Sequence, residues 1–220
     1  METDSYPVTA VTTPSRRPER ARYDRQTVHA VLDEALICHL AYVRDGRPVL
    51  IPTIHARVGE RLYLHGSTGA SVSRAGLVDG VAVCVAATII DGLVLARSAF
   101  HHSMNYRSVV VHGVARPVSD AAECAAALDA VVNRVWPGRS EGCRPPSRKE
   151  LAATSLLALD LLEVSAKVRA GGVADEPEDL DGPWWAGIVP VGMVYGEPEA
   201  AVDLLPGRPA PGARPVTVTA

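Results

Sequence analysis

Residues 37–65, ICHLAYVRDGRPVLIPTIHARVGERLYLH, form the stretch that decides the fold class. Three apolar and β-branched runs in it are separated by the turn residues Asp45-Gly46 and Gly59. Short apolar runs bounded by such turn residues are typical of antiparallel strands. In the last run Leu62 and Leu64 alternate with Arg, Tyr and His, which indicates a strand with one buried face. The stretch therefore predicts a β-meander.

The rest of the chain extends this meander. Parallel strands would need a crossover helix after each strand, and the apolar runs that follow residue 80 are joined by short connections. The fold class is therefore mainly β, an antiparallel β-barrel with a few flanking helices. The expected elements are strands over 81–90, 93–98 and 106–117, with a turn at Asp91-Gly92, and helices over 25–36 and 120–135.

Composition places the chain among globular proteins. Of its 220 residues, 47% are hydrophobic and 21% are charged, which is unlike the composition of disordered chains. The net charge is -3 and the basic residues are scattered, so neither nucleic acid nor a membrane is an expected partner. Four cysteines without a CxxC pair fit free thiols and a cytoplasmic location.

The two ends of the chain differ in composition from its middle. Residues 1–22 are polar and carry no apolar signal segment, and residues 196–220 are rich in Pro, Ala and Gly. We expect a disordered N-terminal arm, one domain over 23–195 and a disordered tail.

A segment rich in Gly and Ser, HGSTGASVSR at His65–Arg74, follows the last strand of the meander. Glycines let the backbone approach an anion, hydroxyl groups donate hydrogen bonds to it, and Arg74 supplies a bidentate cation. The segment is neither a P-loop nor a GxGxxG motif. Taken alone, it supports a phosphate site and a plain surface turn equally.

Two further segments gather unusual side chains. Residues 100–108, FHHSMNYRS, concentrate polar rings and hydroxyl groups before an apolar strand, as at the mouth of a pocket. His101 and His102 are adjacent and point to opposite faces of an extended chain, so we predict no metal site. The pair Trp184-Trp185 either fills a core or dimer contact or stacks on a planar cofactor.

Lys167 and Arg169 lie on a predicted strand upstream of an acidic loop at 175–181. They could pair with that loop or with a bound anion. The chain has no GxSxG or HExxH motif, so the hydrolases that use these motifs are excluded.

The order of these features resembles the pyridoxamine 5'-phosphate oxidase-like flavoproteins, which have the FMN-binding split-barrel fold, and in particular the branch with nitroimidazole-resistance flavoproteins. Four stretches carry the resemblance, at 62–67, 71–74, 98–109 and 185–190. It implies a homodimer with FMN at the subunit interface and a small-molecule substrate. The residues that the resemblance assigns to the cofactor are Pro52, Thr53, Ile54, His65, Gly66, Ser67, Ser71, Arg74, Ser103, Asn105, Tyr106, Ser108 and Trp185.

The chain departs from the pyridoxamine phosphate oxidases proper at two places. Those enzymes carry an Arg-rich strand before the flavin and an Arg soon after the C-terminal Trp. Here the strand at 49–55 reads VLIPTIH, and Ala186, Gly187 and Ile188 follow Trp185. A pyridoxine phosphate substrate would lack its anion clamp, which disfavours a role in vitamin synthesis.

The sequence therefore supports two functions. The first is an FMN-dependent oxidoreductase acting on an unidentified small organic substrate, with His65, His102 and Tyr106 as candidates for orienting substrate or moving a proton. The alternative is a non-catalytic protein that sequesters or senses flavin, or binds haem through one of its histidines. A deazaflavin cofactor, which related barrels use, also stays open.

Overall fold

The computed structural model describes residues 4–75 and 79–212, and the side chains of Arg74 and Ala75 lie outside this description. The chain divides into two compact units. The first comprises Met1–Ile89 and Asn105–Gly171, and the second comprises Ile90–Met104 and Gly172–Ala220. No helix in the described ranges is long and apolar enough to cross a membrane.

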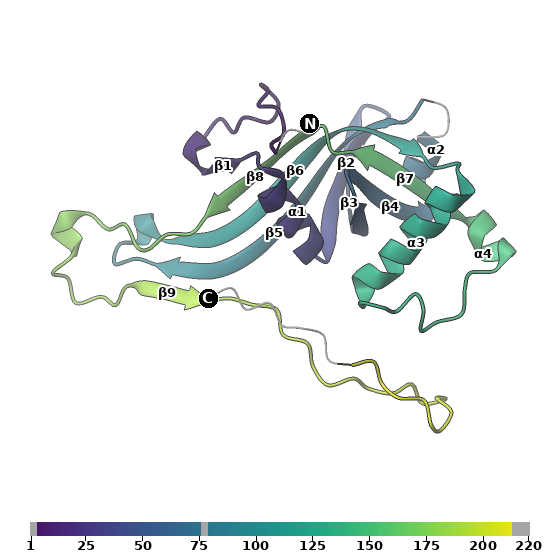
Figure 1. Cartoon of the computed structure of the whole chain (residues 1–220). Helices are drawn as coiled ribbons and strands as arrows, with labels where there is room; N and C mark the ends of the chain where they lie inside the picture. Colours follow the sequence, from purple (N-terminus) through teal and green to yellow (C-terminus); the bar gives the residue numbers. More distant parts are fainter. Residues whose placement is uncertain (1–3, 76–78, 213–220) are drawn as a thin grey trace. The chain divides into compact units, whose positions relative to one another are not determined.

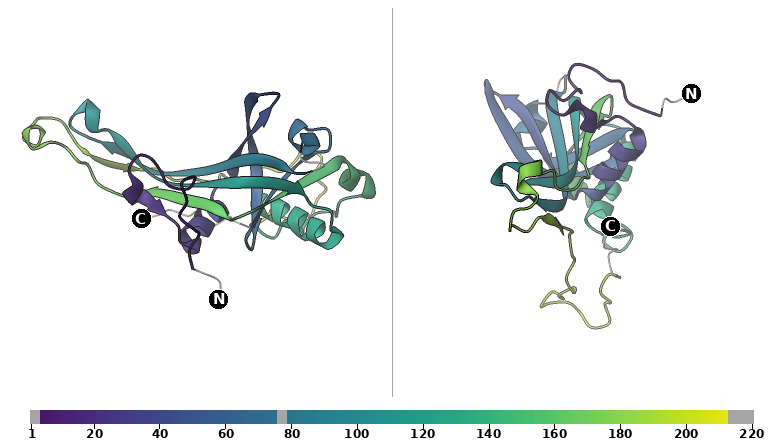
Figure 2. Two further views of the ribbon diagram at one scale, coloured as in Figure 1. Left: turned by 90° about the horizontal axis from the view of Figure 1, so that it is seen from above. Right: turned by 90° about the vertical axis from the view of Figure 1, so that its left-hand side faces the viewer.

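The first unit is an antiparallel barrel, which confirms the predicted fold class (Figures 1 and 2). Its strands are β1 (Ala21–Arg22), β2 (Ile37–Arg44), β3 (Arg47–Val58), β4 (Arg61–Ser67), β5 (Val81–Leu95), β6 (Ser103–Pro117), β7 (Thr154–Asp160) and β8 (Glu163–Arg169), of which β5 and β6 continue into the second unit. They are ordered β1-β8-β6-β7-β4-β3-β2-β5. An additional pairing between β5 and β6 joins the strands β6, β7, β4, β3, β2 and β5 into a closed ring.

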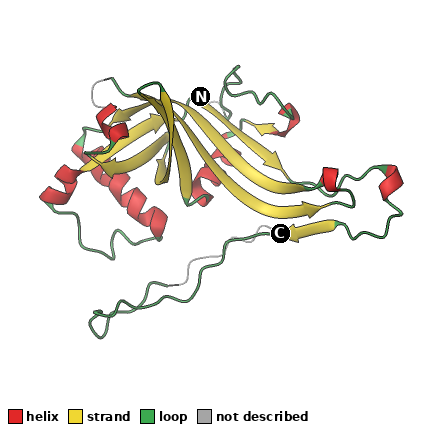
Figure 3. Ribbon diagram, turned by 180° about the vertical axis from the view of Figure 1, so that it is seen from behind, coloured by secondary structure: helices red, strands yellow, loops and turns green. Residues whose placement is uncertain are grey.

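The helices lie outside the strands of this barrel (Figure 3). Helix α1 (Arg25–Glu34) begins at Asp24, whose carboxylate accepts a hydrogen bond from Thr27 N at 2.8 Å. Helix α3 (Ala121–Val135) begins in the same way at Asp120, which accepts from Glu123 N at 2.8 Å. These caps satisfy backbone donors that a helix N-terminus leaves unpaired. The helices predicted over 25–36 and 120–135 are confirmed, and two short ones join them, α2 (Ser71–Ala75) and α4 (Arg148–Ala153).

The predicted turn at Asp91-Gly92 is wrong. Strand β5 runs through both residues without interruption. A Cβ atom on Gly92 would lie 3.1 Å from Ile188 Cγ2 and 3.3 Å from Val189 O, so the glycine is needed here for a close approach between strands. The same Asp-Gly pattern that often marks a turn therefore marks a tight strand contact in this chain.

The N-terminal segment packs more closely than the flexible arm that composition suggests. The Tyr6 ring is 3% exposed and belongs to the barrel core. Its hydroxyl group donates to Glu60 Oε2 at 2.8 Å, and the Arg25 guanidinium lies 4.6 Å from the ring centroid. A single buried aromatic residue thus anchors a segment that is otherwise polar.

The second unit is held by a strand pairing and a buried ion pair. Strand β9 (Gly187–Pro190) pairs antiparallel with residues 92–95 of β5. The Asp175 side chain is 1% exposed and accepts hydrogen bonds from Arg97 N and Arg97 Nη1, at 3.0 Å each. Trp184 and Trp185 are mostly exposed within the described chain.

Candidate functional site

Strand β4 presents different residues to the two sides of the barrel wall. Leu62 and Leu64 belong to the barrel core, whereas Tyr63 packs beneath α3. Because side chains alternate along a strand, His65 shares the face of Tyr63, and it lies opposite Leu156 of β7. The predicted strand is confirmed, but it is not half-buried: residues 62–64 are buried on both faces, because α3 covers the second face.

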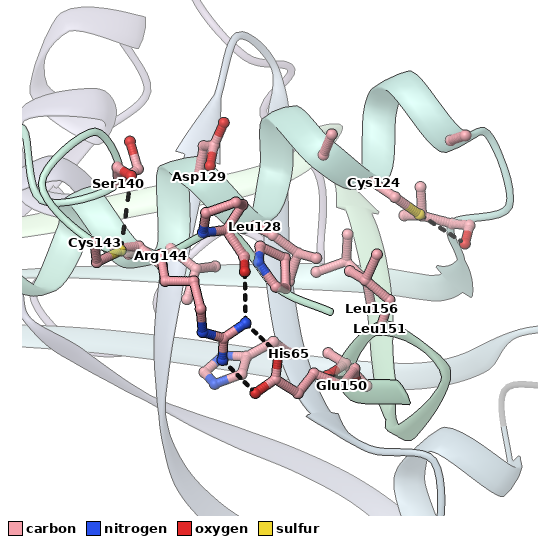
Figure 4. A pocket seen from close by; sticks show the side chains of 18 of the residues that line it. His65, Cys124, Leu128, Asp129, Ser140, Cys143, Arg144, Glu150, Leu151 and Leu156 are labelled. Atoms are coloured by element: carbon pink, nitrogen blue, oxygen red, sulfur yellow. Dashed lines mark hydrogen bonds and ion pairs between the residues drawn. The ribbon is translucent and has the colours of Figure 1, made fainter. Parts of the chain in front are cut away.

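A cavity of about 930 Å³ lies on this face, between α3, α4 and the connection that joins them (Figure 4). Its volume is near the upper end of the ~300–1,000 Å³ typical of cofactor and ligand sites. Most of the lining side chains are apolar, among them Val118, Leu128, Val131, Val132, Leu151 and Leu156.

The imidazole ring of His65 is the distinctive polar group of this cavity. His65 lines the cavity and is classed as exposed. Across residues 4–75 and 79–212, its ring takes part in no hydrogen bond or ion pair. An imidazole whose nitrogens have no protein partner, beside an apolar cavity, is available to a ligand.

Two thiols also line the cavity, and both are engaged with the backbone. Cys124 Sγ donates to Val118 O at 3.4 Å, and Cys143 Sγ donates to Ser140 O at 3.6 Å. Burial and then the nearby Glu123 carboxylate raise the pKa of the Cys124 thiol. That thiol is therefore protonated near neutral pH and is a weaker ligand than the imidazole.

A charged pair lies at the α4 side of the cavity. Arg144 Nη2 and Nη1 donate to the two carboxylate oxygens of Glu150 at 2.7 and 3.1 Å. Hydrogen bonds from Arg144 and from Ser147 lower the pKa of the Glu150 carboxyl to about 2. Figure 4 shows this pair near His65. Asp129 and Glu141 also line the cavity, which therefore combines apolar walls with one imidazole, one guanidinium and three carboxylates.

The predicted phosphate segment forms a compact loop at the end of β4. Gly69 N donates to Ser67 Oγ at 3.2 Å, and Ala70 N donates to Ser67 O at 2.9 Å. The Ser73 hydroxyl lies 3.8 Å from the position of a Cβ on Gly66. Gly66 and Ser73 are thus brought together, and the N–H groups of Gly69 and Ala70 are hydrogen-bonded to Ser67 within the loop.

Sequence reasoning missed Tyr42, which holds the start of α2. Its hydroxyl group lies 2.5 Å from Ser71 Oγ, and its side chain is 4% exposed. A tyrosine in a chain with few aromatics was the available signal, but only the fold brings β2 next to α2. The side chain of Arg74, the predicted phosphate donor, lies outside the described residues.

Residues Pro52, Thr53 and Ile54 lie on the part of β3 that pairs with β2, where Pro52 is opposite His39. Pro52 is exposed, and Thr53 and Ile54 are half-buried. On β6, Asn105 Oδ1 accepts from Gly171 N at 3.1 Å, so this side chain serves the local backbone.

The structure separates two groups of the predicted cofactor residues within the first unit. Tyr106 lies ten residues before Arg116 on β6, which corresponds to about 33 Å of strand. Arg116 pairs with β7 next to the region where Ser67 pairs with Thr154. The β4–α2 loop and the Tyr106 end of β6 are therefore too far apart in one chain for a single flavin mononucleotide.

Three predicted residues belong to the second unit. The His102 ring is hydrogen-bonded through Nδ1 to Ser98 O at 3.0 Å, and Ser103 begins β6. Trp185 is 66% exposed, and its ring lies 2.7 Å from the position of a Cβ on Gly187. The ring therefore packs over a residue that has to be small.

The first unit is a closed antiparallel barrel with a hydroxyl-rich loop and an apolar cavity covered by helices. These features are typical of proteins that bind a cofactor in or beside a barrel. Residues 24–168 match the family described as pyridoxamine 5'-phosphate oxidase. The chain belongs to this family, which agrees with the resemblance seen in its sequence. No curated protein matches the chain.

Solved structures extend the comparison over nearly the whole chain. The flavocytochrome Anf3 from Azotobacter vinelandii is 37% identical, with a TM-score of 0.85, over 92% of this chain and 94% of that one. The FAD and haem binding protein from Mycobacterium smegmatis is 39% identical, with a TM-score of 0.82, over 87% and 94% of the two chains.

A more distant structure shares the fold alone. It is a candidate 5-nitroimidazole antibiotic resistance protein from Bacteroides thetaiotaomicron. Its sequence is 18% identical, with a TM-score of 0.56, over 67% of this chain and 86% of that one.

Proposed function

We propose that this protein binds a haem in the α3–α4 cavity and a flavin at the β4–α2 loop, and that it transfers electrons between them. The observation that carries the proposal is the His65 imidazole, which lines an apolar cavity and has no partner among the described residues. The two structures that are 37% and 39% identical are a flavocytochrome and a protein that binds FAD and haem.

The cavity residues fit a haem. A porphyrin is a large, flat and mostly apolar ring with an anionic edge, and the cavity offers apolar walls and about 930 Å³. His65 would hold the haem iron, because neutral imidazole nitrogens are common ligands of that metal. Leu128 and Val132 of α3 would pack against the ring, and Arg144 would meet its carboxylates.

The loop residues fit the phosphate of a flavin. Ser67 and Ser71 would donate hydroxyl groups to it, and Arg74 would supply its counter-charge. Residues 52–54 of β3 would follow the flavin edge, as in the family that the chain resembles. The remaining contacts, at Tyr106 and Ser108, would come from a second copy, because the length of β6 separates them from this loop.

The residues of this chain would determine the position and the surroundings of the haem and the flavin. When bound, the two cofactors supply hydride and one-electron chemistry. His65 and Ser67 lie two residues apart on β4, so about 7 Å of strand would join the haem ligand to the flavin site. The apolar side chains of α3 would pack against a bound ring and keep water from that side of it. One strand would thus supply a residue to each of the two cofactor sites.

We take the flavin to be FAD and not the FMN expected from the sequence. Two structures that are more than 35% identical cover 92% and 87% of this chain, and one of them is described as an FAD and haem binding protein. FAD differs from FMN by an added adenylate, so the protein must accommodate a second phosphate.

The absorption spectrum and cofactor content of the purified protein test the proposed function. We expect flavin bands together with a Soret band, and one haem and one FAD per chain after extraction. A colourless protein that binds neither haemin nor flavin on titration would contradict the proposal. A protein that binds flavin but no haem would restrict the function to a flavoprotein.

A further inference from the structure

Cationic side chains from distant parts of the sequence meet at the β1–β8 edge of the first unit. Strand β1 pairs with β8 so that Ala21 lies opposite Lys167, and Figure 1 shows the two strands side by side. Lys167 Nζ donates to Arg16 O at 2.8 Å. The 3-10 turn Pro18–Arg20 comes directly before β1, so Arg20 joins this edge. We refer to Arg20, Lys167 and Arg169 as the β8 cation cluster.

Two neutral oxygen atoms accept hydrogen bonds from the Arg169 guanidinium. Its Nη1 donates to Asn105 Oδ1 at 2.5 Å and to Gly171 O at 3.1 Å. The same Asn105 oxygen accepts from Gly171 N at 3.1 Å. Asn105, which the sequence assigned to cofactor contact, is therefore a positioning residue for the guanidinium.

The electrostatics of the β8 cation cluster favour an anion. Burial and then the positive charge of Arg20 lower the pKa of the Arg169 guanidinium. A nearby carboxylate, Glu19, pairs with Arg17 at 3.9 Å, where both side chains are 60% exposed. Arg20 and Arg169 repel each other, and a bound phosphate would relieve this repulsion. The cluster stands out because the chain as a whole carries a net charge of -3.

The cluster lies next to the residues proposed to face a flavin. On β6, Tyr106 pairs in register with Arg169, and Ser108 pairs with Lys167. Ser108 Oγ also donates to Lys167 O at 3.3 Å. Because cross-strand partners share a face of the sheet, the cations lie beside Tyr106 and Ser108.

We propose that the β8 cation cluster binds the adenylate phosphate of a dinucleotide. The ligand is either FAD, through its adenylate half, or a nicotinamide dinucleotide that donates electrons, since both carry an adenylate phosphate that FMN lacks. The position of the site follows from the chain's own charges, and the identity of the dinucleotide rests on the proposed function. Arg and Lys side chains at a phosphate form charge-assisted hydrogen bonds, and the fixed fork of Arg169 suits two phosphate oxygens.

Binding measurements on charge-neutral variants test this site. One variant carries both Lys167→Gln and Arg169→Gln. A second variant carries Arg20→Gln alone, so that the site can still be tested if the double variant does not fold. The control is Arg116→Gln, an exposed cation near the other end of β6. Dissociation constants for FAD, FMN and NADPH would be measured by titration calorimetry on the full chain with haem present.

Each result has a distinct meaning. We expect the cluster variants to raise the dissociation constant of at least one dinucleotide by about tenfold or more, with FMN unchanged within about twofold. A loss confined to FAD identifies the adenylate half, and a loss confined to NADPH identifies an electron donor. Unchanged constants for both dinucleotides, or an equal loss in Arg116→Gln, would overturn the proposal. Failure of the native chain to bind any flavin would instead overturn the proposed function.

Discussion

At the scale of the residue, the proposed function depends on which way His65 points. The alternation of Leu62 and Leu64 with polar neighbours was visible in the sequence and predicted a two-faced strand. The sequence could not show that the second face borders a cavity, because α3 and α4, which form its walls, follow more than 50 residues later. His65 was predicted as a cofactor residue and as a candidate for orienting substrate or moving a proton, but its place in this cavity was not predicted.

A second histidine, His55, makes stability depend on pH. Its ring is fully buried, Nε2 lies 2.8 Å from Leu32 O, and Nδ1 has no hydrogen-bond partner within the described residues. Burial lowers the pKa of His55, so the folded protein binds this proton less well than the unfolded chain. The stabilising contribution is complete above the unfolded pKa of ~6.5 and is lost as the pH falls below it.

We therefore expect the free energy of unfolding to fall between pH 7.5 and 5, with His55 contributing up to about 1.4 kcal/mol per pH unit below ~6.5. His55→Gln should flatten this dependence, whereas the exposed-site variant His39→Gln should leave it unchanged. Urea unfolding at several pH values measures the effect. Parallel curves for the native chain and His55→Gln would show that this ring does not titrate on unfolding.

At the scale of the element, local patterns predicted the helices well and one strand boundary poorly. The helices expected over 25–36 and 120–135 are present as α1 and α3, and Asp24 and Asp120 cap them. Asp91-Gly92 matched a turn pattern but lies inside β5, because a distant strand, β9, pairs with it there. A turn motif describes local preference only, and a long-range strand pairing can outweigh it.

Gly80, just before β5, occupies a position that only glycine fits without strain, and the sequence does not reveal this. Its φ is +84°, and an added Cβ would lie 2.6 Å from Val114 Cγ1 and 2.9 Å from Ala115 O. Gly80→Ala should therefore lower the free energy of unfolding by about 2–4 kcal/mol, from backbone strain together with overpacking.

The matched control for this prediction is Gly46→Ala. Gly46 has a φ of +71°, and an added Cβ would meet nothing within 4 Å, so we expect a loss of only about 1–2 kcal/mol. Thermal or urea unfolding of both variants gives the comparison. Equal losses of unfolding free energy in the two variants would mean that the close contact between residue 80 and β6 does not destabilise the protein.

At the scale of the whole molecule, the family and its barrel could be predicted from the sequence, because strand runs and a few motifs carry them. The packing of Tyr6 into the core and the division into two units could not, since both depend on contacts between distant residues. The sequence resemblance also implied a homodimer, and the separation of Tyr106 from the β4–α2 loop gives a physical reason to propose one.

A shared site predicts that two defective chains can complement each other. Ser71→Asp should block the phosphate loop, and Tyr106→Ala should weaken the β6 side, so each homodimer should bind flavin poorly. A mixed dimer, purified through two different tags, should contain one native site and bind one flavin. Fluorescence titration with FAD counts the sites. Mixed dimers that stay empty would contradict a site shared between copies.

The most direct test of the proposed function is haem binding by His65→Gly with and without imidazole. We expect the native chain to bind haemin with a Soret band, and His65→Gly to bind it at least about tenfold more weakly, because the axial ligand is gone. Added imidazole should restore the band, and His39→Gly should behave like the native chain. Native haemin affinity in His65→Gly, with no response to imidazole, would contradict the proposed haem site.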